Sequence, residues 1–150
     1  MAGLYYEDFT VGMEFKHALT RTVTEMDNIL FCAMTHNPQP LHLDEEFAKK
    51  TEYGQRIVNS LFTLGLVIGV TVADTTLGTT LGNLGMSDVR FRNPVVHGDT
   101  IHVVTRIKEM RESKSRPAAG LVVFEHTGYN HRDQEIAYCL RTGLMRKRPA

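Results

Sequence analysis

The chain has 150 residues, 42% of them hydrophobic and 23% charged, and its 17 basic and 17 acidic side chains cancel to a formal net charge of zero. This length predicts a single domain, 1–150, that buries about two thirds of its unfolded surface. The neutral balance excludes the basic footprint of a protein that binds nucleic acid or an anionic membrane. The N-terminal residues hold no run typical of a secretory signal, so we expect a cytoplasmic protein.

The first third of the chain predicts an arm, a strand and a helix. Residues 1–12 are expected to form an irregular arm that packs aromatic side chains against a neighbouring segment. β-Branched residues between 13 and 23 favour a strand. Thr24 followed by Asp27 is typical of a helix N-cap with an acid at the third helical position. Apolar residues then recur at helical spacing and predict a helix over 25–35: Ile29, Leu30, Ala33 and Met34.

Prolines 38 and 40 end this helix, because proline lacks a backbone donor and pushes the residue before it toward extended geometry. The segment 36–44 is therefore predicted to be a stiff, mostly extended loop that holds its polar side chains in fixed directions. Asp44 is expected to cap a short helix over 45–50.

The stretch 57–74 is nearly all apolar or small beyond its polar start and shows no polar stripe at a helical period. A helix that is apolar on every side must be covered on every side, so we predict a buried central helix with caps at Asn59 and Asp74. It falls short of the roughly 18 to 20 apolar residues that cross a bilayer, which argues against a membrane span. Gly65 and Gly69 share one face and are expected to let a sheet or a second helix approach closely.

Beyond residue 74 the pattern changes to β-strands and turns. Strands are predicted over 77–92, 100–109, 121–127 and 135–145, with a basic polar loop at 111–119 and a tight turn at 130–133. This order predicts an α+β fold in which a curved antiparallel β-sheet wraps around the long central helix. One edge of such a sheet stays open, and edge-to-edge pairing into a homodimer or higher homo-oligomer would cover it.

The two cysteines, Cys32 and Cys139, lie in apolar segments and not at a metal-like or redox spacing, so we expect buried free thiols. His42 and Asp44 are metal-ligand residue types, but no third ligand lies at a telling spacing. We therefore expect no metal site.

Three segments carry a resemblance to a known family. Residues 37–44 read Asn-Pro-Gln-Pro-Leu-His-Leu-Asp, 56–61 read Arg-Ile-Val-Asn-Ser-Leu, and 91–100 read Phe-Arg-Asn-Pro-Val-Val-His-Gly-Asp-Thr. In this order they resemble the Asp-x-Asn-Pro-[apolar]-His-x-Asp, Ile-[small]-His-Gly-Met and Phe-x-x-Pro-Val-x-x-Gly-Asp-Thr motifs of the MaoC-like dehydratases, the R-specific enoyl-CoA hydratase family. The resemblance covers about residues 9–145. It implies a hot-dog fold, an acyl-CoA substrate and no cofactor beyond the CoA of that substrate.

The sequence departs from these motifs at three places. The family's catalytic Asp aligns with Asn37, its following Asn with Gln39, and its His-Gly pair with Asn59 and Ser60. The Asn-Pro-Gln-Pro-Leu-His form, together with Ser-Lys-Ser-Arg-Pro at 113–117, looks like the subgroup that hydrates branched C5 dicarboxylyl-CoA esters such as mesaconyl- or itaconyl-CoA.

Hydration of a 2-enoyl thioester needs a base for the proton of water, an acid for the α-carbon, and donors for an enolate-like oxygen. Histidine, whose unperturbed pKa is near 6.5, can fill the first two roles in turn, and His42 is the candidate. Asn37 cannot take up a proton, but its amide can orient the attacking water. Asn59 and Ser60 are expected to bind the thioester oxygen through backbone N–H groups at the positive end of the central helix.

Other basic residues are candidates for the rest of the substrate. Lys114 and Arg116 are candidate partners for CoA phosphates or a substrate carboxylate, or simply part of a solvated loop, and Arg56 is a candidate carboxylate partner. Two other functions stay open: a hot-dog acyl-CoA thioesterase, and a non-catalytic acyl-CoA-binding subunit, which the missing Asp permits. Purely structural roles also stay open: His42 as a loop histidine and Asn37 as a turn residue.

Overall fold

The computed structural model describes residues 3–149, so Met1 and Ala2 of the expected arm lie outside the described residues. The rest of the arm contains a 3-10 turn, η1 (Tyr6–Asp8), and leads to the buried Phe9. The Phe9 ring meets Phe124 edge-on at 5.4 Å between centroids. The expected packing of arm aromatics is therefore confirmed for Phe9.

The strands form one antiparallel sheet in the order β1-β4-β5-β6-β3, with β2 paired to β4 beyond the end of β1. It consists of β1 (Glu14–Lys16), β2 (Arg21–Thr22), β3 (Thr80–Arg90), β4 (Thr100–Glu112), β5 (Ala119–Tyr129) and β6 (Glu135–Arg146). The prediction of one strand over 13–23 is wrong. Residues 17–20 lie opposite only two residues of β4, so the extra residues leave the ladder and divide the strand.

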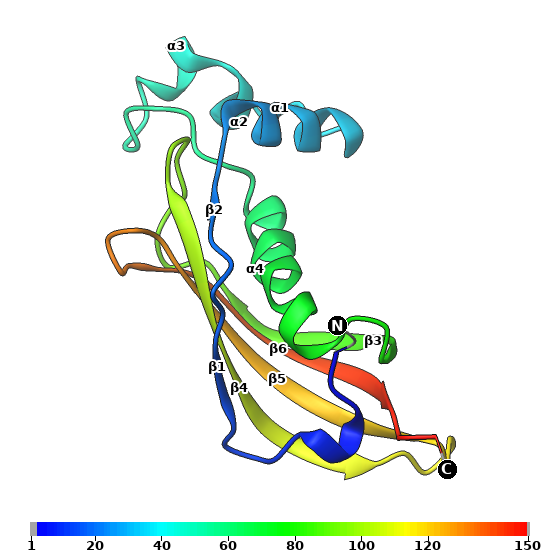
Figure 1. The fold of residues 1–150 in the computed structure, drawn as a ribbon. Coiled ribbons are helices and arrows are strands. Elements are labelled where there is room, and N and C mark those ends of the chain that lie inside the picture. The colour runs from blue at the N-terminus through cyan, green and yellow to red at the C-terminus, as the bar shows by residue number, and fades with distance from the viewer. Residues whose placement is uncertain (1–2, 150) are drawn as a thin grey trace.

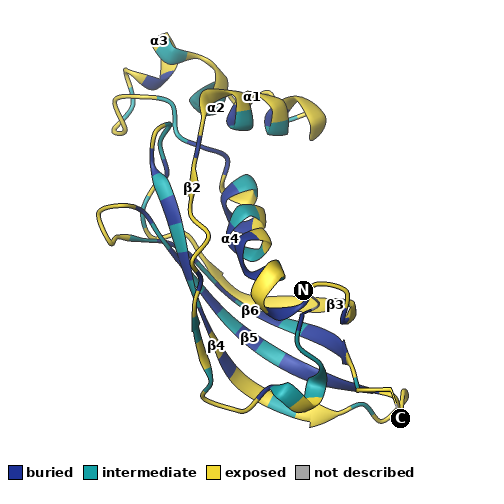
Figure 2. Ribbon diagram, viewed as in Figure 1, coloured by how far each residue is buried: buried dark blue, intermediate teal, exposed yellow. Residues whose placement is uncertain are grey.

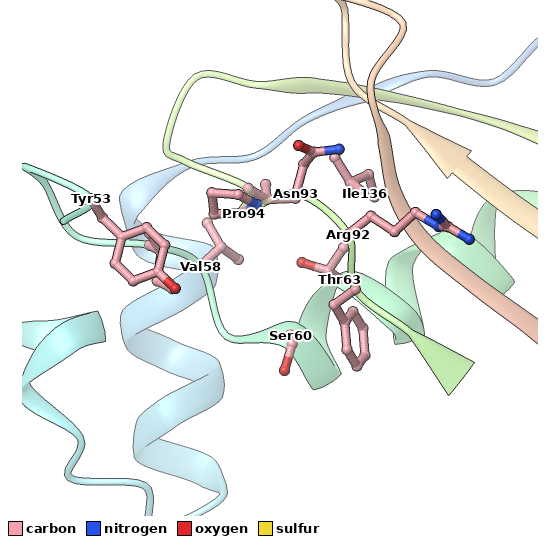
Figure 3. Close-up of a pocket in the computed structure, with 11 residues that line it drawn as sticks. Tyr53, Val58, Ser60, Thr63, Arg92, Asn93, Pro94 and Ile136 are labelled. Carbon is pink, nitrogen blue, oxygen red and sulfur yellow. The ribbon is translucent and has the colours of Figure 1, made fainter. Parts of the chain in front are cut away.

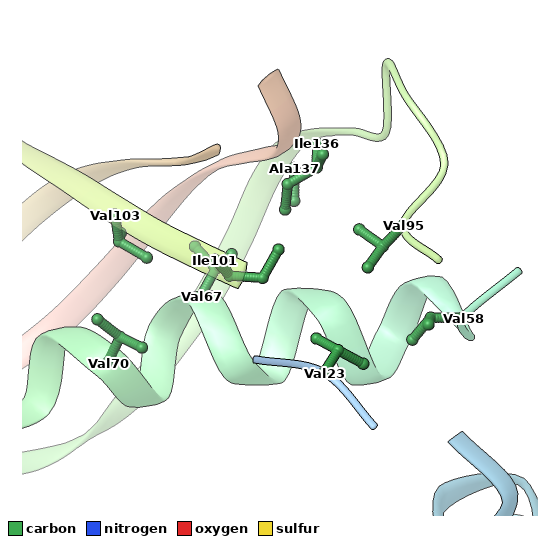
Figure 4. Packing of buried hydrophobic residues seen from close by; sticks show 9 residues of the cluster. All are labelled: Val23, Val58, Val67, Val70, Val95, Ile101, Val103, Ile136 and Ala137. Atoms are coloured by element: carbon green, nitrogen blue, oxygen red, sulfur yellow. The ribbon is translucent and has the colours of Figure 1, made fainter. Parts of the chain in front are cut away.

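The long helix α4 (Ser60–Thr75) lies on the concave face of this sheet, as the sequence predicts (Figure 1). Its sheet-facing side packs into an apolar cluster with β4 and β6, drawn in Figure 4: Val23, Val58, Val67, Val70, Val95, Ile101, Val103, Ile136 and Ala137. The helix packs closely on the sheet at Gly128 of β5, where an added Cβ would lie 2.4 Å from Val67 Cγ2. A side chain there would push the helix off the sheet.

The prediction that α4 is covered on all sides is wrong for the single chain (Figure 2). Leu61 is 61% exposed, and Gly65 and Gly69 are exposed on the same face. An added Cβ at either glycine would meet nothing within 4 Å, so the expected close approach does not occur there within the chain. The sheet curves around only one side of the helix, and the opposite apolar stripe stays open.

Three short helices gather beyond the N-terminal end of α4: α1 (Glu25–Met34), α2 (Pro40–Leu43) and α3 (Glu45–Ala48) (Figure 1). Thr24 caps α1 in a reciprocal capping box with Asp27, and Asp44 caps α3, as predicted. The expectation of a mostly extended segment is wrong at 40–43. Proline is well suited to the first position of a helix, where its missing N–H costs nothing, and Pro40 begins a single turn there.

The apolar residues that predict α1 are not the ones it buries. Ile29, Leu30 and Met34 are exposed, whereas the fully buried side chains of this helix are Asn28 and Cys32, one turn apart. A polar amide therefore lies inside, where it must find hydrogen-bond partners. Both cysteines are buried and free, as predicted.

Candidate active site

His42 lies on the single turn of α2, and its ring has a fixed orientation. Its Nδ1 is 2.8 Å from the backbone oxygen of Ile57, three residues before α4 begins. A carbonyl oxygen only accepts, so Nδ1 carries the hydrogen. In the neutral ring Nε2 is then the unprotonated nitrogen, which is the form a general base needs.

Asn37 lies in a turn five residues before His42. Its Oδ1 accepts a hydrogen bond from Gln39 N at 3.0 Å, and its own N donates to Cys32 O at 2.9 Å. This is the local turn geometry that Asn commonly adopts before proline. Among the described residues no hydrogen bond joins Asn37 to His42. The side-chain NH2 and the second lone pair of Oδ1 stay available to a water molecule.

Asn59 and Ser60 form the start of α4, and the structure gives them different surroundings. Asn59 is buried, and its Oδ1 accepts from Leu61 N at 3.0 Å as the N-cap of the helix. Ser60 is exposed and lines a cavity of about 180 Å³, with Tyr53, Val58, Thr63, Pro94 and Ile136 among its other walls (Figure 3). Among the described residues the N–H of Ser60 donates no hydrogen bond. It is therefore a free donor at the positive end of the helix.

Arg56 is held by two carboxylates of the protein. Its Nε lies 2.8 Å from Glu45 Oε2 and its Nη2 2.7 Å from Glu25 Oε1. The hydrogen bonds to Glu45 and then to Glu25 raise the pKa of Arg56. These bonds tie α1 to α3, so the charge of Arg56 is already balanced before any substrate binds.

Lys114 and Arg116 lie in the turn between β4 and β5, at the opposite end of the sheet from α1, α2 and α3 (Figure 1). They line a surface hollow of about 450 Å³ together with Leu84, Leu121 and Leu144. The structure of the single chain does not bring them together with His42 or Ser60.

Two residues that the sequence analysis did not single out lie at this site. Asn28 Nδ2 is 3.1 Å from the backbone oxygen of His42 and 3.2 Å from Nε2 of His97. Burial lowers the pKa of His97, and the charge of Arg56 lowers it further, which keeps this ring neutral and able to accept. The signal was a polar residue one turn before Cys32 on a helix, and the exposed apolar residues of that helix obscured it.

The described residues contain no cluster of three or more His, Cys, Asp or Glu side chains that could hold a metal ion. No helix in residues 3–149 is both long and apolar enough to cross a membrane.

The sequence matches the MaoC like domain family over residues 8–130. The chain belongs to this family. A mesaconyl-CoA hydratase of Cereibacter sphaeroides is 31% identical over 147 residues, which are 98% of this chain and 42% of that protein. The MaoC-like chain thus spans about two fifths of the length of this curated relative.

Solved structures agree on the fold. A protein described as a monoamine oxidase regulatory protein from Archaeoglobus fulgius superposes with a TM-score of 0.87 at 31% identity, over 99% of this chain and 98% of that chain. A conserved hypothetical protein from Mycobacterium tuberculosis, described as a double hotdog fold, gives a TM-score of 0.88 at 20% identity, over 98% of this chain and 45% of that chain. The α+β hot-dog fold expected from the sequence is therefore confirmed.

Proposed function

We propose that this MaoC-like domain adds water to, or removes it from, the double bond of a 2-enoyl-CoA thioester. The observation that carries the proposal is the His42 ring, with Nδ1 donating to Ile57 O at 2.8 Å and Nε2 left as the acceptor. The same backbone segment that accepts from His42 leads directly into α4, where the N–H of Ser60 is a free donor. The base and the oxyanion donor therefore belong to one connected unit.

In the hydration direction Nε2 of His42 takes a proton from water while the oxygen of that water bonds to the β-carbon. The electron pair of the C=C double bond forms a new double bond between the α-carbon and the thioester carbon, and the π pair of the carbonyl moves onto its oxygen, which the N–H of Ser60 and the helix dipole stabilise. The imidazolium then returns the proton to the α-carbon, so all atoms of the water enter the product. In this proposal the amide of Asn37 orients the water.

We propose a branched C5 dicarboxylyl-CoA, such as mesaconyl- or itaconyl-CoA, as the substrate class. The Asn-Pro-Gln-Pro-Leu-His segment and the mesaconyl-CoA hydratase relative support this choice. Arg56, Lys114 and Arg116 remain predicted contacts to a substrate carboxylate or to CoA phosphates. The pairing of Arg56 with Glu25 and Glu45 does not support its part in this prediction.

The deciding experiment incubates the purified protein with crotonyl-, mesaconyl- and itaconyl-CoA, follows the enoyl absorbance and identifies the products by mass. We expect one ester to gain a water molecule with its thioester intact. Release of free CoA would instead identify a thioesterase. Binding without turnover of any ester would identify a non-catalytic acyl-CoA-binding protein.

We also propose that the chain forms a homodimer through β3. This strand is the last in the sheet, so one row of its backbone N–H and C=O groups has no partner strand among the described residues. Exposed apolar side chains line it: Leu81, Leu84, Met86 and Val89. When two β3 strands pair antiparallel around a two-fold axis, the open backbone N–H and C=O groups of both sheets gain hydrogen-bond partners. The open stripe of α4 at Leu61, Gly65 and Gly69 is the second apolar surface that a partner copy can cover.

Light scattering coupled to gel filtration tests the dimer. We expect twice the mass of the chain for the wild type and a shift toward the single-chain mass for Leu84→Lys, which places a charge on the pairing strand. Leu19→Lys is the matched control, because Leu19 is similarly exposed but lies beside the opposite edge of the sheet. A wild-type protein of single-chain mass would contradict the proposal.

A further inference from the structure

The side chain of Asn28 is fully buried, on the inner face of α1. Burying an amide without hydrogen bonds is strongly unfavourable, so such a residue is expected to have partners on both its oxygen and its nitrogen. Asn28 has both. Its Oδ1 accepts from Asn59 N at 2.9 Å, and its Nδ2 lies 3.1 Å from His42 O and 3.2 Å from Ile57 O.

The bond to Ile57 matters because His42 uses the same carbonyl oxygen. Nδ1 of His42 donates to Ile57 O at 2.8 Å, and Nδ2 of Asn28 approaches that oxygen from a second direction at 3.2 Å. A carbonyl oxygen has two lone pairs, and here both have a donor. The direction of the carbonyl is thereby fixed, and so is the direction of the imidazole that bonds to it.

The oxygen of the same amide sets where α4 begins. Asn59 is the N-cap of α4, and its N–H is bound by Asn28 Oδ1. The next residue is Ser60, whose free N–H is the proposed oxyanion donor. A shift of Asn59 would turn this N–H away from the thioester oxygen.

A third element meets the amide. Nε2 of His97, in the turn before β4, lies 3.2 Å from Asn28 Nδ2. This turn is itself joined to the start of α4, since Val58 N donates to Val95 O at 2.8 Å. One side chain on α1 thus contacts the His42 turn, the start of α4 and the His97 turn.

We propose that Asn28 is a positioning residue that fixes the His42 imidazole and the first turn of α4 relative to each other. This inference rests on the proposed hydratase function for its kinetic consequence and on geometry for its structural one. Since a misplacement of about 1 Å can cost on the order of a hundredfold in rate, the loss of this amide reduces kcat more than it raises KM.

Asn28→Asp is the sharpest variant, because it keeps the shape and the oxygen that accepts from Asn59 while it removes both N–H donors. Asn28→Ser removes the amide without burying a charge and serves if the aspartate variant does not fold. We expect kcat to fall about thirtyfold to a hundredfold while KM stays within about threefold. Asn130→Asp is the matched control: Asn130 is equally buried, but it holds the β5–β6 turn through Gln134 and Arg132.

Nitrogen-15 NMR of histidine-labelled protein gives a readout that does not need activity. In the wild type His42 is expected as a single tautomer, with hydrogen on Nδ1, and in the Asn28 variants as a mixture. The control keeps the wild-type tautomer and kcat even if it lowers the melting temperature. Folded Asn28 variants with wild-type kcat and an unmixed tautomer would overturn the inference. If the wild type hydrates no ester, the proposed function fails, and the tautomer alone decides whether Asn28 positions His42.

Discussion

At the scale of single residues, the proposed chemistry depends on which nitrogen of His42 is free. The carbonyl of Ile57 holds Nδ1 and leaves Nε2 as the proposed base. Removing a positioned acid–base group typically costs 10² to 10⁴ in rate, so we expect His42→Ala to lose at least about a hundredfold in hydration with unchanged folding. Steady-state kinetics and circular dichroism check the two halves of this prediction.

His36→Asn is the control for that variant. His36 lies on the same segment, is exposed, and has a φ of 53°, a left-handed conformation that Asn tolerates. This variant should keep wild-type turnover. If His42→Ala also does, the acid–base role is wrong.

Asn37→Asp tests whether the amide of residue 37 limits the rate of hydration. The carboxylate can still accept from Gln39 N, so the turn is preserved, and its second oxygen adds a group able to take up a proton. We expect hydration of a linear ester such as crotonyl-CoA to rise about tenfold or more. Asn37→Ser, which can also cap the turn but supplies no acid, should give no gain. Equal rates for the two variants would show that the native amide is not the limiting group.

The candidate residues show how far a motif can predict a site. The resemblance placed His42 and the Asn59–Ser60 segment together, and the structure joins them through Ile57 and Asn28. The resemblance did not show how far Lys114 lies from them. β4 is 13 residues long and carries the chain roughly 40 Å, from the turn before the strand to the loop that holds Lys114. Asn28 lay outside every motif. Its hydrogen bonds to the His42 turn and to the start of α4 are to backbone atoms, which no residue pattern reveals.

At the scale of elements, local signals predicted helices better than their buried faces. The capping box and the apolar spacing predicted α1 within one residue, and the polar entry at Asn59 predicted the start of α4. The same spacing suggested the wrong buried face for α1. Periodicity shows that apolar residues share a face, but which face is covered depends on the elements packed against it. In the single chain α1 meets the His42 turn through Asn28, and its apolar face stays open.

The α1 cap can be tested separately from the chemistry. Thr24 Oγ1 accepts from Asp27 N at 3.3 Å, and Asp27 Oδ2 accepts from Thr24 N at 2.8 Å. Replacing such a cap with alanine typically costs about 1 kcal/mol, so we expect Thr24→Ala to lower the free energy of unfolding by that amount in urea titrations. Thr10→Ala, at an exposed position outside any helix, is the control. An unchanged unfolding free energy in Thr24→Ala would mean that α1 does not depend on its cap.

At the scale of the whole molecule, a polar chain that is buried except at Asp74 joins the end of α4 to three strands of the sheet. Asp74 bonds to His17 at 2.8 Å, His17 to Thr105 at 2.9 Å, Thr105 to His126 at 2.9 Å, and Arg141 Nε donates to His126 Nε2 at 3.0 Å. It therefore links the end of α4 through β4 and β5 to β6. Since Nε2 of His126 accepts from a guanidinium, this ring must be neutral in the native protein.

From this chain of hydrogen bonds we predict that the protein loses stability in mild acid. Burial, and then the charge of Arg141, lower the pKa of His126 from 6.5 to about 3. Below pH 6.5 His126 therefore binds a proton in the unfolded chain but not in the folded protein. This difference does not lower the stability above pH 6.5, and it lowers the stability progressively as the pH drops toward 3. The slope is on the order of 1.4 kcal/mol per pH unit, or about 2 kcal/mol between pH 7 and pH 5.

Urea unfolding at pH 7 and pH 5 measures this loss of stability. The pH interval lies above the range in which protonation of the carboxylates destabilises the fold, so their effect is not included. Asp27, whose pKa the Arg21 bond lowers to about 2, contributes stability that is lost only below about pH 4. The lowered pKa of His97 acts in the same direction as His126, so His126→Gln should reduce the difference between the two pH values without abolishing it. The same difference in His126→Gln and the wild type would mean that the buried chain does not govern the acid response of this fold.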